Sequence, residues 1–248
     1  MQVRPIPRAV PAPIQNLTIL TVLFALTQQI WSFITFYKVA DNVLIEAVVR
    51  VLPTLFAALA VAFISRQHAN RASLPWRYLA LALALNTIGT ILYQLFKGVF
   101  NITAFPSIAD VFLSLTPMVM VYGFFRLPHV ALQRLEGLRA VLDSGIIVMT
   151  ISGFIWFFVL SPAILAHYAK TNGLSFEVSL AMTYPIYDLL ALALLITNVA
   201  RWERSSLGIE LRWLMLSLLA WLIADGYFLA RCFFPPLPES HPLEAGWA

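Results

Sequence analysis

The chain has 248 residues, of which 60% are hydrophobic and only 11% are charged, and its formal net charge is +4. Soluble domains carry about 25% charged residues, so this composition excludes an ordinary soluble protein and predicts an integral membrane protein. The single cysteine, Cys232, excludes an internal disulfide and a cysteine-based metal cluster. Because little of the chain lies outside long apolar runs, no room is left for a separate soluble catalytic domain.

Seven apolar runs reach the length of about 20 residues that a membrane-spanning helix needs. In chain order the expected spans are Leu17–Tyr37, Val43–Ile64, Trp76–Phe96, Ile108–Arg126, Ala140–Leu160, Val178–Ala200 and Leu211–Arg231. We therefore expect an all-α, polytopic helix bundle over residues 17–231, preceded by a cytoplasmic tail of residues 1–16. The first run lacks a small-residue cleavage site, so we interpret it as a retained helix and not as a signal peptide.

The distribution of basic residues predicts the orientation, because cytoplasmic loops of membrane proteins carry an excess of lysine and arginine. One set of loops and helix ends holds Arg4, Arg8, Arg66, Arg71, Arg77, Arg126, Arg134, Arg139, Arg201, Arg204 and Arg212. The opposite set holds Lys38, Arg50, Lys97, Lys170 and Arg231. The excess of eleven over five predicts a cytoplasmic N-terminus. The positive charge is thereby assigned to topology, and no nucleic-acid partner is expected.

Residues 232–248 are expected to form an outer loop followed by the start of an eighth helix. A proline-rich stretch, Pro235–Pro238, comes first, and His241–Ala248 then has the features of a helix start. We expect the sequence to belong to a longer chain, in which this helix returns to the cytoplasm.

Ionisable side chains at membrane depth are costly, so each one is a candidate functional group. Asp110, Asp188 and Asp225 fall in the outer halves of three different expected helices. Tyr184 precedes Asp188 by four residues, which places both on one helix face. We expect these groups to line an outward-facing pocket for an unknown small ligand. The candidate pocket residues are Arg50, Tyr93, Asp110, Tyr184, Tyr187, Asp188, Asp225 and Tyr227.

Two of these candidates also have a purely structural interpretation. Asp110 follows Ser107 by three residues, which is the spacing of a helix-capping box. Arg50 follows Glu46 by four residues, so the two can form an ion pair along one helix. Either arrangement would satisfy the charged group without a ligand.

The remaining acidic candidates are harder to explain locally. Asp188 and Asp225 lie several residues inside their expected spans, where they either bind a ligand or hold helices together by hydrogen bonds. The tyrosines suit packing and membrane-interface positions equally well. The sequence leaves these alternatives open.

The chain lacks the sequence patterns of common membrane cofactors and enzymes. All four histidines fall in expected loops or at span ends, which argues against haem held by intramembrane histidine. No lysine lies inside an expected span, so retinal has no attachment point. Metalloprotease, P-loop and serine-hydrolase motifs are missing, and no nucleophilic triad is visible. We therefore expect no catalytic residue, metal site or cofactor.

Four motifs occur in a characteristic order along the second half of the chain. They are Pro106-Ser107-Ile108-Ala109-Asp110-Val111-Phe112, Tyr184-Pro185-Ile186-Tyr187-Asp188-Leu189-Leu190, Ala224-Asp225-Gly226-Tyr227 and His241-Pro242-Leu243-Glu244-Ala245-Gly246-Trp247. From about Trp76 onward the chain resembles the multi-helix N-terminal membrane regions of bacterial signalling proteins. The resemblance is chiefly to diguanylate cyclases with a GGDEF domain, sometimes joined to an EAL phosphodiesterase domain. Glu244 stands where that pattern has aspartate.

The resemblance implies a sensory module in the bacterial inner membrane. In such proteins further helices and a cytoplasmic catalytic domain follow the last motif, and the output is cyclic di-GMP. Because such output domains usually act as dimers, we expect a homodimer formed through the late helices. The resemblance supplies no ligand.

Two other classes of function remain open. A small-molecule transporter or channel would share the proline-interrupted helices and the polar groups within spans. A structural subunit of a larger membrane complex would suit the short loops and the many aromatic residues. Membrane lipids are expected partners in every case. Because the acidic groups cluster on the outer half, the sequence favours a one-sided binding pocket over a conduction path.

Overall fold

A computed structural model describes residues 43–67, 74–100, 105–127, 134–162, 164–165, 176–202 and 207–233, with isolated helical positions between Ile19 and Ile34. Regular structure in these ranges is entirely helical. The predicted first span, Leu17–Tyr37, falls largely outside the described residues. The predicted N-terminal tail and the predicted start of an eighth helix, within 234–248, lie outside them as well.

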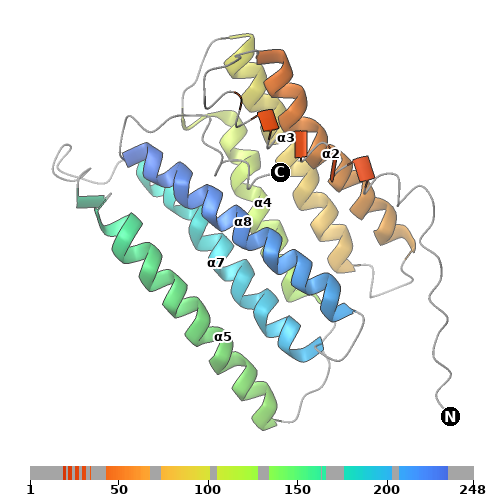
Figure 1. Cartoon of the computed structure of the whole chain (residues 1–248), viewed down its shortest axis with the longest axis vertical. Helices are drawn as coiled ribbons and strands as arrows, with labels where there is room; N and C mark the ends of the chain where they lie inside the picture. The colour runs from red at the N-terminus through yellow and green to blue at the C-terminus, as the bar shows by residue number, and fades with distance from the viewer. Residues whose placement is uncertain are drawn as a thin grey trace.

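The predicted spans from Val43 onward are confirmed as helices (Figure 1). The helices are α2 (Val43–Gln67), α3 (Leu74–Gly98), α4 (Ile108–Phe125), α5 (Arg134–Ile155), α7 (Phe176–Trp202) and α8 (Leu207–Phe233). All six are long and apolar enough to cross a membrane. The largest boundary difference is in α5, which begins six residues before the expected Ala140 and continues into a π-helical segment, η2 (Trp156–Leu160). The coarse prediction of an all-helical protein, with several helices that could span a membrane, is therefore confirmed in the described residues.

The helices pack in a continuous series. In this series α3 lies against both α2 and α4, α4 lies against α7, and α7 lies against both α8 and α5. Figure 1 shows α5 at the outer edge of the bundle, beside α7. The α7 helix therefore contacts α4, α5 and α8, and η2, the continuation of α5, also contacts α8 directly.

Three contacts show which helix ends lie together. Lys97 at the end of α3 contacts Glu46 at the start of α2, with 3.2 Å between Nζ and Oε1. Ser114 and Tyr184, which lie early in α4 and α7, are joined by a hydrogen bond of 3.2 Å. The Phe228 ring near the end of α8 packs edge-on against Tyr184. The end of α3 also leads directly into the start of α4. The start of α2, the end of α3, the starts of α4 and α7 and the end of α8 therefore lie at one end of the bundle, which we name the site end. The opposite end is named the far end.

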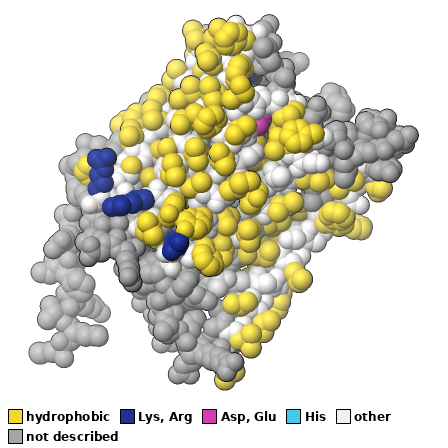
Figure 2. Space-filling view, turned by 180° about the vertical axis from the view of Figure 1, so that it is seen from behind, with side chains coloured by type: hydrophobic (Ala, Val, Ile, Leu, Met, Phe, Trp, Pro, Cys, Tyr) yellow, Lys and Arg dark blue, Asp and Glu magenta, His cyan; other side chains and the backbone are white. Residues whose placement is uncertain are grey.

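The largest apolar core occupies the half of the bundle toward the far end. Its buried members come from α3, α4, α7 and α8, with Leu127 from the segment just after α4. They are Leu79, Ala82, Met120, Phe124, Leu127, Ala191, Leu192, Leu195, Leu218 and Leu222. Large apolar side chains are also exposed on the outer faces of the helices. Figure 2 shows one such face, on which hydrophobic side chains dominate and basic side chains gather toward one margin. An apolar outer surface bordered by basic groups is typical of helices that contact lipid.

The α5 helix is attached to the bundle by a polar contact as well as by apolar packing. The Thr197 hydroxyl on α7 donates a hydrogen bond to Ser144 Oγ on α5, at 3.0 Å. One position later, the Asn198 side-chain amide donates to the Phe124 carbonyl at the end of α4, at 3.4 Å. These contacts fix α7 between α4 and α5 at the far end.

The close packing of α3 and α4 depends on Gly89. A Cβ atom added at Gly89 would lie 2.7 Å from Leu113 Cγ, which is closer than real Cβ contacts. Small residues let helices in a membrane approach closely, and this approach supplies the van der Waals contacts that hold them together.

A Gly89→Val substitution is therefore expected to force α3 and α4 apart and to destabilise the protein by about 1–3 kcal/mol. The matched control is Gly145→Val on α5, because an added Cβ at Gly145 meets nothing within 4 Å. Reversible unfolding in mixed micelles would compare the two variants. Equal losses of stability would contradict the proposed role of Gly89.

Candidate functional site

The start of α4 is organised by Asp110. Its Oδ2 atom accepts hydrogen bonds from the Ser107 backbone N–H, at 2.6 Å, and from Ser107 Oγ, at 3.0 Å. The predicted helix start, in which Asp110 reaches back to Ser107, is thus confirmed. The other carboxylate oxygen, Oδ1, lies 3.4 Å from the Tyr184 hydroxyl on α7 and accepts a long hydrogen bond from it. Asp110 therefore caps its own helix and also contacts a second one.

The Tyr184 hydroxyl bridges α4 and α7. It accepts a hydrogen bond from Ser114 Oγ, one helical turn after Asp110, and donates one to Asp110. The Tyr184 side chain is buried, and a buried phenol usually finds such polar partners. Ser114 was not among the predicted pocket residues, although its spacing of four residues places it on the same helix face as Asp110.

Asp188 follows Tyr184 by one turn and is fully buried. Its carboxyl group interacts with the carboxyl group of Asp225 on α8. Tyr184 lies within electrostatic range of both Asp110 and Asp225. The structure thus brings together four of the predicted pocket residues from three helices. The set Asp110, Tyr184, Asp188 and Asp225 is named the acidic cluster.

Asp110 and Asp188 have little charge compensation within the part of the chain that the structure describes. Neither carboxylate oxygen of Asp188 has a hydrogen bond of ordinary geometry. Neither Asp110 nor Asp188 forms an ion pair with a described lysine or arginine. Carboxyl groups at membrane depth are costly without a partner, and truly unsatisfied ones are rare. The cluster is therefore an unusual feature that packing alone does not explain.

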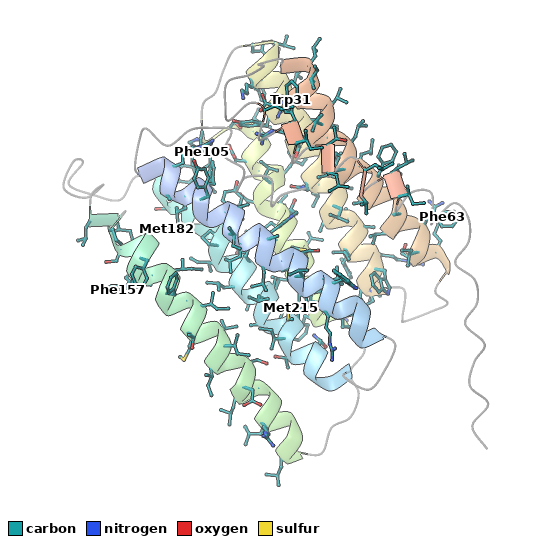
Figure 3. All side chains as sticks on the ribbon, in the orientation of Figure 1. Trp31, Phe63, Phe105, Phe157, Met182 and Met215 are labelled. Carbon is teal, nitrogen blue, oxygen red and sulfur yellow. The ribbon has the colours of Figure 1, made fainter. Side chains whose placement is uncertain are left out.

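Two phenylalanine rings pack beside Tyr184 of the acidic cluster. The Phe228 ring packs edge-on against Phe105, with 5.3 Å between centroids, and against Tyr184, at 6.1 Å. The Arg231 guanidinium lies over Phe228, 5.4 Å from the ring centroid. Figure 3 shows Phe105 beside the end of α8, near Met182. This pair, Phe105 and Phe228, is named the aromatic cap; sequence analysis missed it because it forms only between helices.

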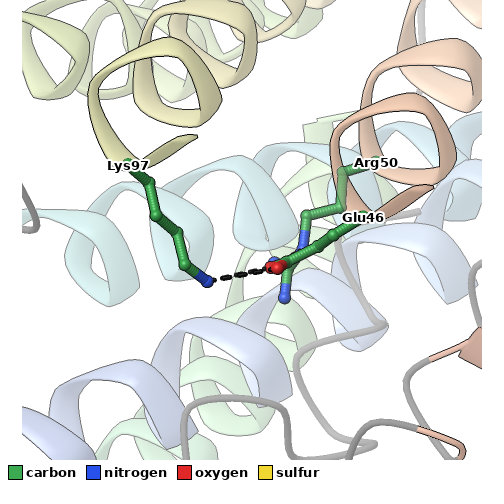
Figure 4. A network of polar contacts seen from close by, with 3 residues as sticks. All are labelled: Glu46, Arg50 and Lys97. Atoms are coloured by element: carbon green, nitrogen blue, oxygen red, sulfur yellow. Dashed lines mark hydrogen bonds and ion pairs between the residues drawn. The ribbon is translucent and has the colours of Figure 1, made fainter. Parts of the chain in front are cut away.

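A second polar centre lies between α2 and α3. Glu46 forms ion pairs with Arg50, at 3.2 Å, and with Lys97, also at 3.2 Å (Figure 4). The predicted Glu46–Arg50 pair is confirmed. Lys97 was expected only as a basic residue at the end of a span. Arg50, a predicted pocket residue, is thus engaged by Glu46, and it makes no ion pair with Asp110 or Asp188.

The remaining predicted pocket residues are Tyr93, Tyr187 and Tyr227, all of which are half-buried. Their participation in the site stays a prediction. Among the described residues, no group of three histidine, cysteine, aspartate or glutamate side chains is arranged to hold a metal ion. No family model, curated protein or solved structure matches the chain.

Proposed function

We propose that the chain is a membrane-embedded sensory module in which the acidic cluster binds a small ligand. The proposal rests on the convergence of Asp110, Tyr184, Asp188 and Asp225 from three helices, with a fully buried Asp188 whose carboxylate oxygens make no hydrogen bond of ordinary geometry. Polar groups that a helical protein keeps inside the membrane, and that its own side chains leave unsatisfied, are suited to recognition. No catalytic group is assigned to these residues.

The packing of the bundle supports a signalling role for such a site. The cluster joins α7 to α4 through Tyr184 and joins α7 to α8 through Asp188 and Asp225. A ligand changes a conformational equilibrium only if it binds one arrangement better than another. A ligand between Asp188 and Asp225 would alter the packing of α8 on α7 and hence the path of the chain beyond α8.

The proposed biological setting follows the resemblance to membrane regions of GGDEF proteins. In that setting the module lies in the bacterial inner membrane with a cytoplasmic N-terminus. It forms a homodimer through the late helices and controls a cytoplasmic diguanylate cyclase. The basic residues of the described chain support this orientation, because Arg66, Arg77, Arg126, Arg139 and Arg212 all belong to the far end.

The test is the cyclic di-GMP level in cells that express the natural full-length gene containing these residues. We expect Asp188→Asn to change that level by about fivefold or more, the scale of a typical coupling between sites. The control is Asp143→Asn on α5, because Asp143 is exposed and only weakly paired with Arg139. Membrane-inserted Asp188→Asn protein with an unchanged cyclic di-GMP level would contradict the proposal.

A further inference from the structure

We infer that Arg126, at the far end of α4, binds the phosphate group of an anionic phospholipid. This site lies at the opposite end of the bundle from the acidic cluster, and its ligand does not depend on the proposed function. Three features support it: the fixed position of the Arg126 guanidinium, the lack of an acidic partner for it among the described residues, and the apolar helix face that adjoins it.

The Arg126 guanidinium is held on one side by Tyr122, four residues earlier in α4. Both Nε and Nη2 donate hydrogen bonds to the Tyr122 hydroxyl, and the Nε-to-oxygen distance is 3.1 Å. The guanidinium carbon lies 5.0 Å from the centroid of the Tyr122 ring, which packs edge-on against Tyr78 of α3, at 4.7 Å. The arginine side chain is therefore ordered before a ligand arrives, which lowers the entropic cost of binding.

This arrangement leaves one edge of the Arg126 guanidinium open. Of its five N–H donors, the Tyr122 hydroxyl accepts one from Nε and one from Nη2. Two donors on Nη1 and one on Nη2 remain, and an adjacent Nη1 and Nη2 pair forms the outer edge of the fork. Two parallel donors of this kind match two oxygens of a phosphate group. Because Arg126 is exposed, a ligand can reach this edge.

The charges at this place favour an anionic ligand. Within the described ranges Arg126 forms no ion pair, and neither does Arg77, which is exposed and precedes Tyr78 in α3. Figure 2 shows basic side chains gathered along one margin of an otherwise apolar face. A zwitterionic headgroup would bring its own ammonium group toward these cations, whereas an anionic headgroup brings only negative charge. The site therefore favours an anionic phospholipid over a zwitterionic one.

The depth of Arg126 favours a lipid over a dissolved anion. The apolar span Ile108–Phe125 ends directly before Arg126, so the guanidinium lies where lipid headgroups meet the hydrocarbon core. Met118 and Leu115 lie four and seven residues before Tyr122, on the same face of α4, and both are exposed. The acyl chains of a bound lipid can pack along this face, which gives them contacts that a dissolved phosphate does not make.

The test titrates the full chain in detergent micelles with phosphatidylglycerol or phosphatidylcholine and counts the bound lipids by native mass spectrometry. The wild type should bind phosphatidylglycerol about fivefold more tightly than phosphatidylcholine. Arg126→Gln should lose about fivefold in affinity for phosphatidylglycerol, the scale expected of one basic residue near a membrane surface. Equal affinity of the wild type for the two lipids would overturn the inference.

The matched control is Arg139→Gln, which removes the same charge from the same end of the bundle. Arg139 lies on α5, where its side chain is exposed and only weakly paired with Asp143. This protein should bind phosphatidylglycerol as the wild type does. An equal loss of affinity in Arg139→Gln and Arg126→Gln would show that only the net charge matters, and would overturn the inference.

Two conservative variants test the geometry of the site. Arg126→Lys keeps the charge but lacks the two-donor edge, so it should retain only part of the affinity. Tyr122→Phe keeps the ring and removes the acceptor that fixes the guanidinium, so it should also weaken binding of phosphatidylglycerol. If Arg126→Gln does not fold, these two proteins replace it, and unchanged affinity in both would overturn the inference.

A competition experiment separates the lipid from a dissolved phosphate. Glycerol 3-phosphate carries the phosphate group without acyl chains, so an equal concentration of it should not displace phosphatidylglycerol from the wild type. Displacement would assign the site to a dissolved phosphate and would overturn the assignment to a lipid.

Discussion

The Glu46→Gln protein is expected to lose about 3 kcal/mol of folding free energy. The reason is that the Glu46 carboxylate forms ion pairs with both Arg50 of α2 and Lys97 of α3. The Glu46 side chain is only 7% exposed, and those of Arg50 and Lys97 are 17% and 20% exposed. Removing the negative charge leaves two poorly solvated cations facing each other. The loss should therefore exceed that of an ordinary surface ion pair, and reversible unfolding in mixed micelles would measure it.

A double-mutant cycle would identify the cause of this loss. If repulsion between Arg50 and Lys97 is responsible, then Lys97→Met in the Glu46→Gln background should recover part of the stability that Glu46→Gln removes. The control is Asp143→Asn, whose partner Arg139 lies 3.9 Å away and is exposed, so its loss should stay below about 0.5 kcal/mol. Strict additivity of the Glu46 and Lys97 changes would show that the pair is not coupled.

The second large effect is expected from Leu195→Ala in the core of α7, at about 2–4 kcal/mol. Leu195 is 0% exposed and belongs to the apolar cluster that joins α3, α4, α7 and α8. Inside a membrane the loss comes mainly from van der Waals contacts, because lipid tails are as apolar as the leucine that is removed.

The matched control for this prediction is Leu190→Ala on the same helix. Leu190 is 46% exposed, so its side chain has fewer protein contacts to lose. Unfolding of both variants in the same micelles should separate them by at least about 1 kcal/mol. A Leu190→Ala protein as unstable as Leu195→Ala would mean that the two faces of α7 have been assigned wrongly.

The largest apolar core and the buried polar groups lie in different halves of the bundle. The large apolar cluster around Leu192 and Leu195 lies toward the far end, whereas the acidic cluster and the Glu46 ion pairs lie toward the site end. Buried polar groups without good hydrogen bonds reduce stability, and well-packed apolar side chains elsewhere in the bundle offset that cost. This division is consistent with a folded protein in which Asp188 is buried and makes no hydrogen bond of ordinary geometry.

The sequence by itself determined the helices and the contacts within a single turn. A run of apolar residues long enough to cross a membrane must become helical, because lipid offers no hydrogen bonds to an open backbone. The reach of Asp110 to Ser107 and of Glu46 to Arg50 follows from spacings of three and four residues along one helix. These interactions need no knowledge of the neighbouring helices.

Only the tertiary structure decided which helices bring their polar groups together. The contact of Tyr184 with Asp110 spans 74 residues, and that of Lys97 with Glu46 spans 51. Such pairs depend on the packing order of the helices and on the close approach that residues such as Gly89 allow. The reason is geometric. An apolar helix can contact lipid in almost any rotation about its own axis, whereas side-chain packing and buried polar contacts favour one particular rotation.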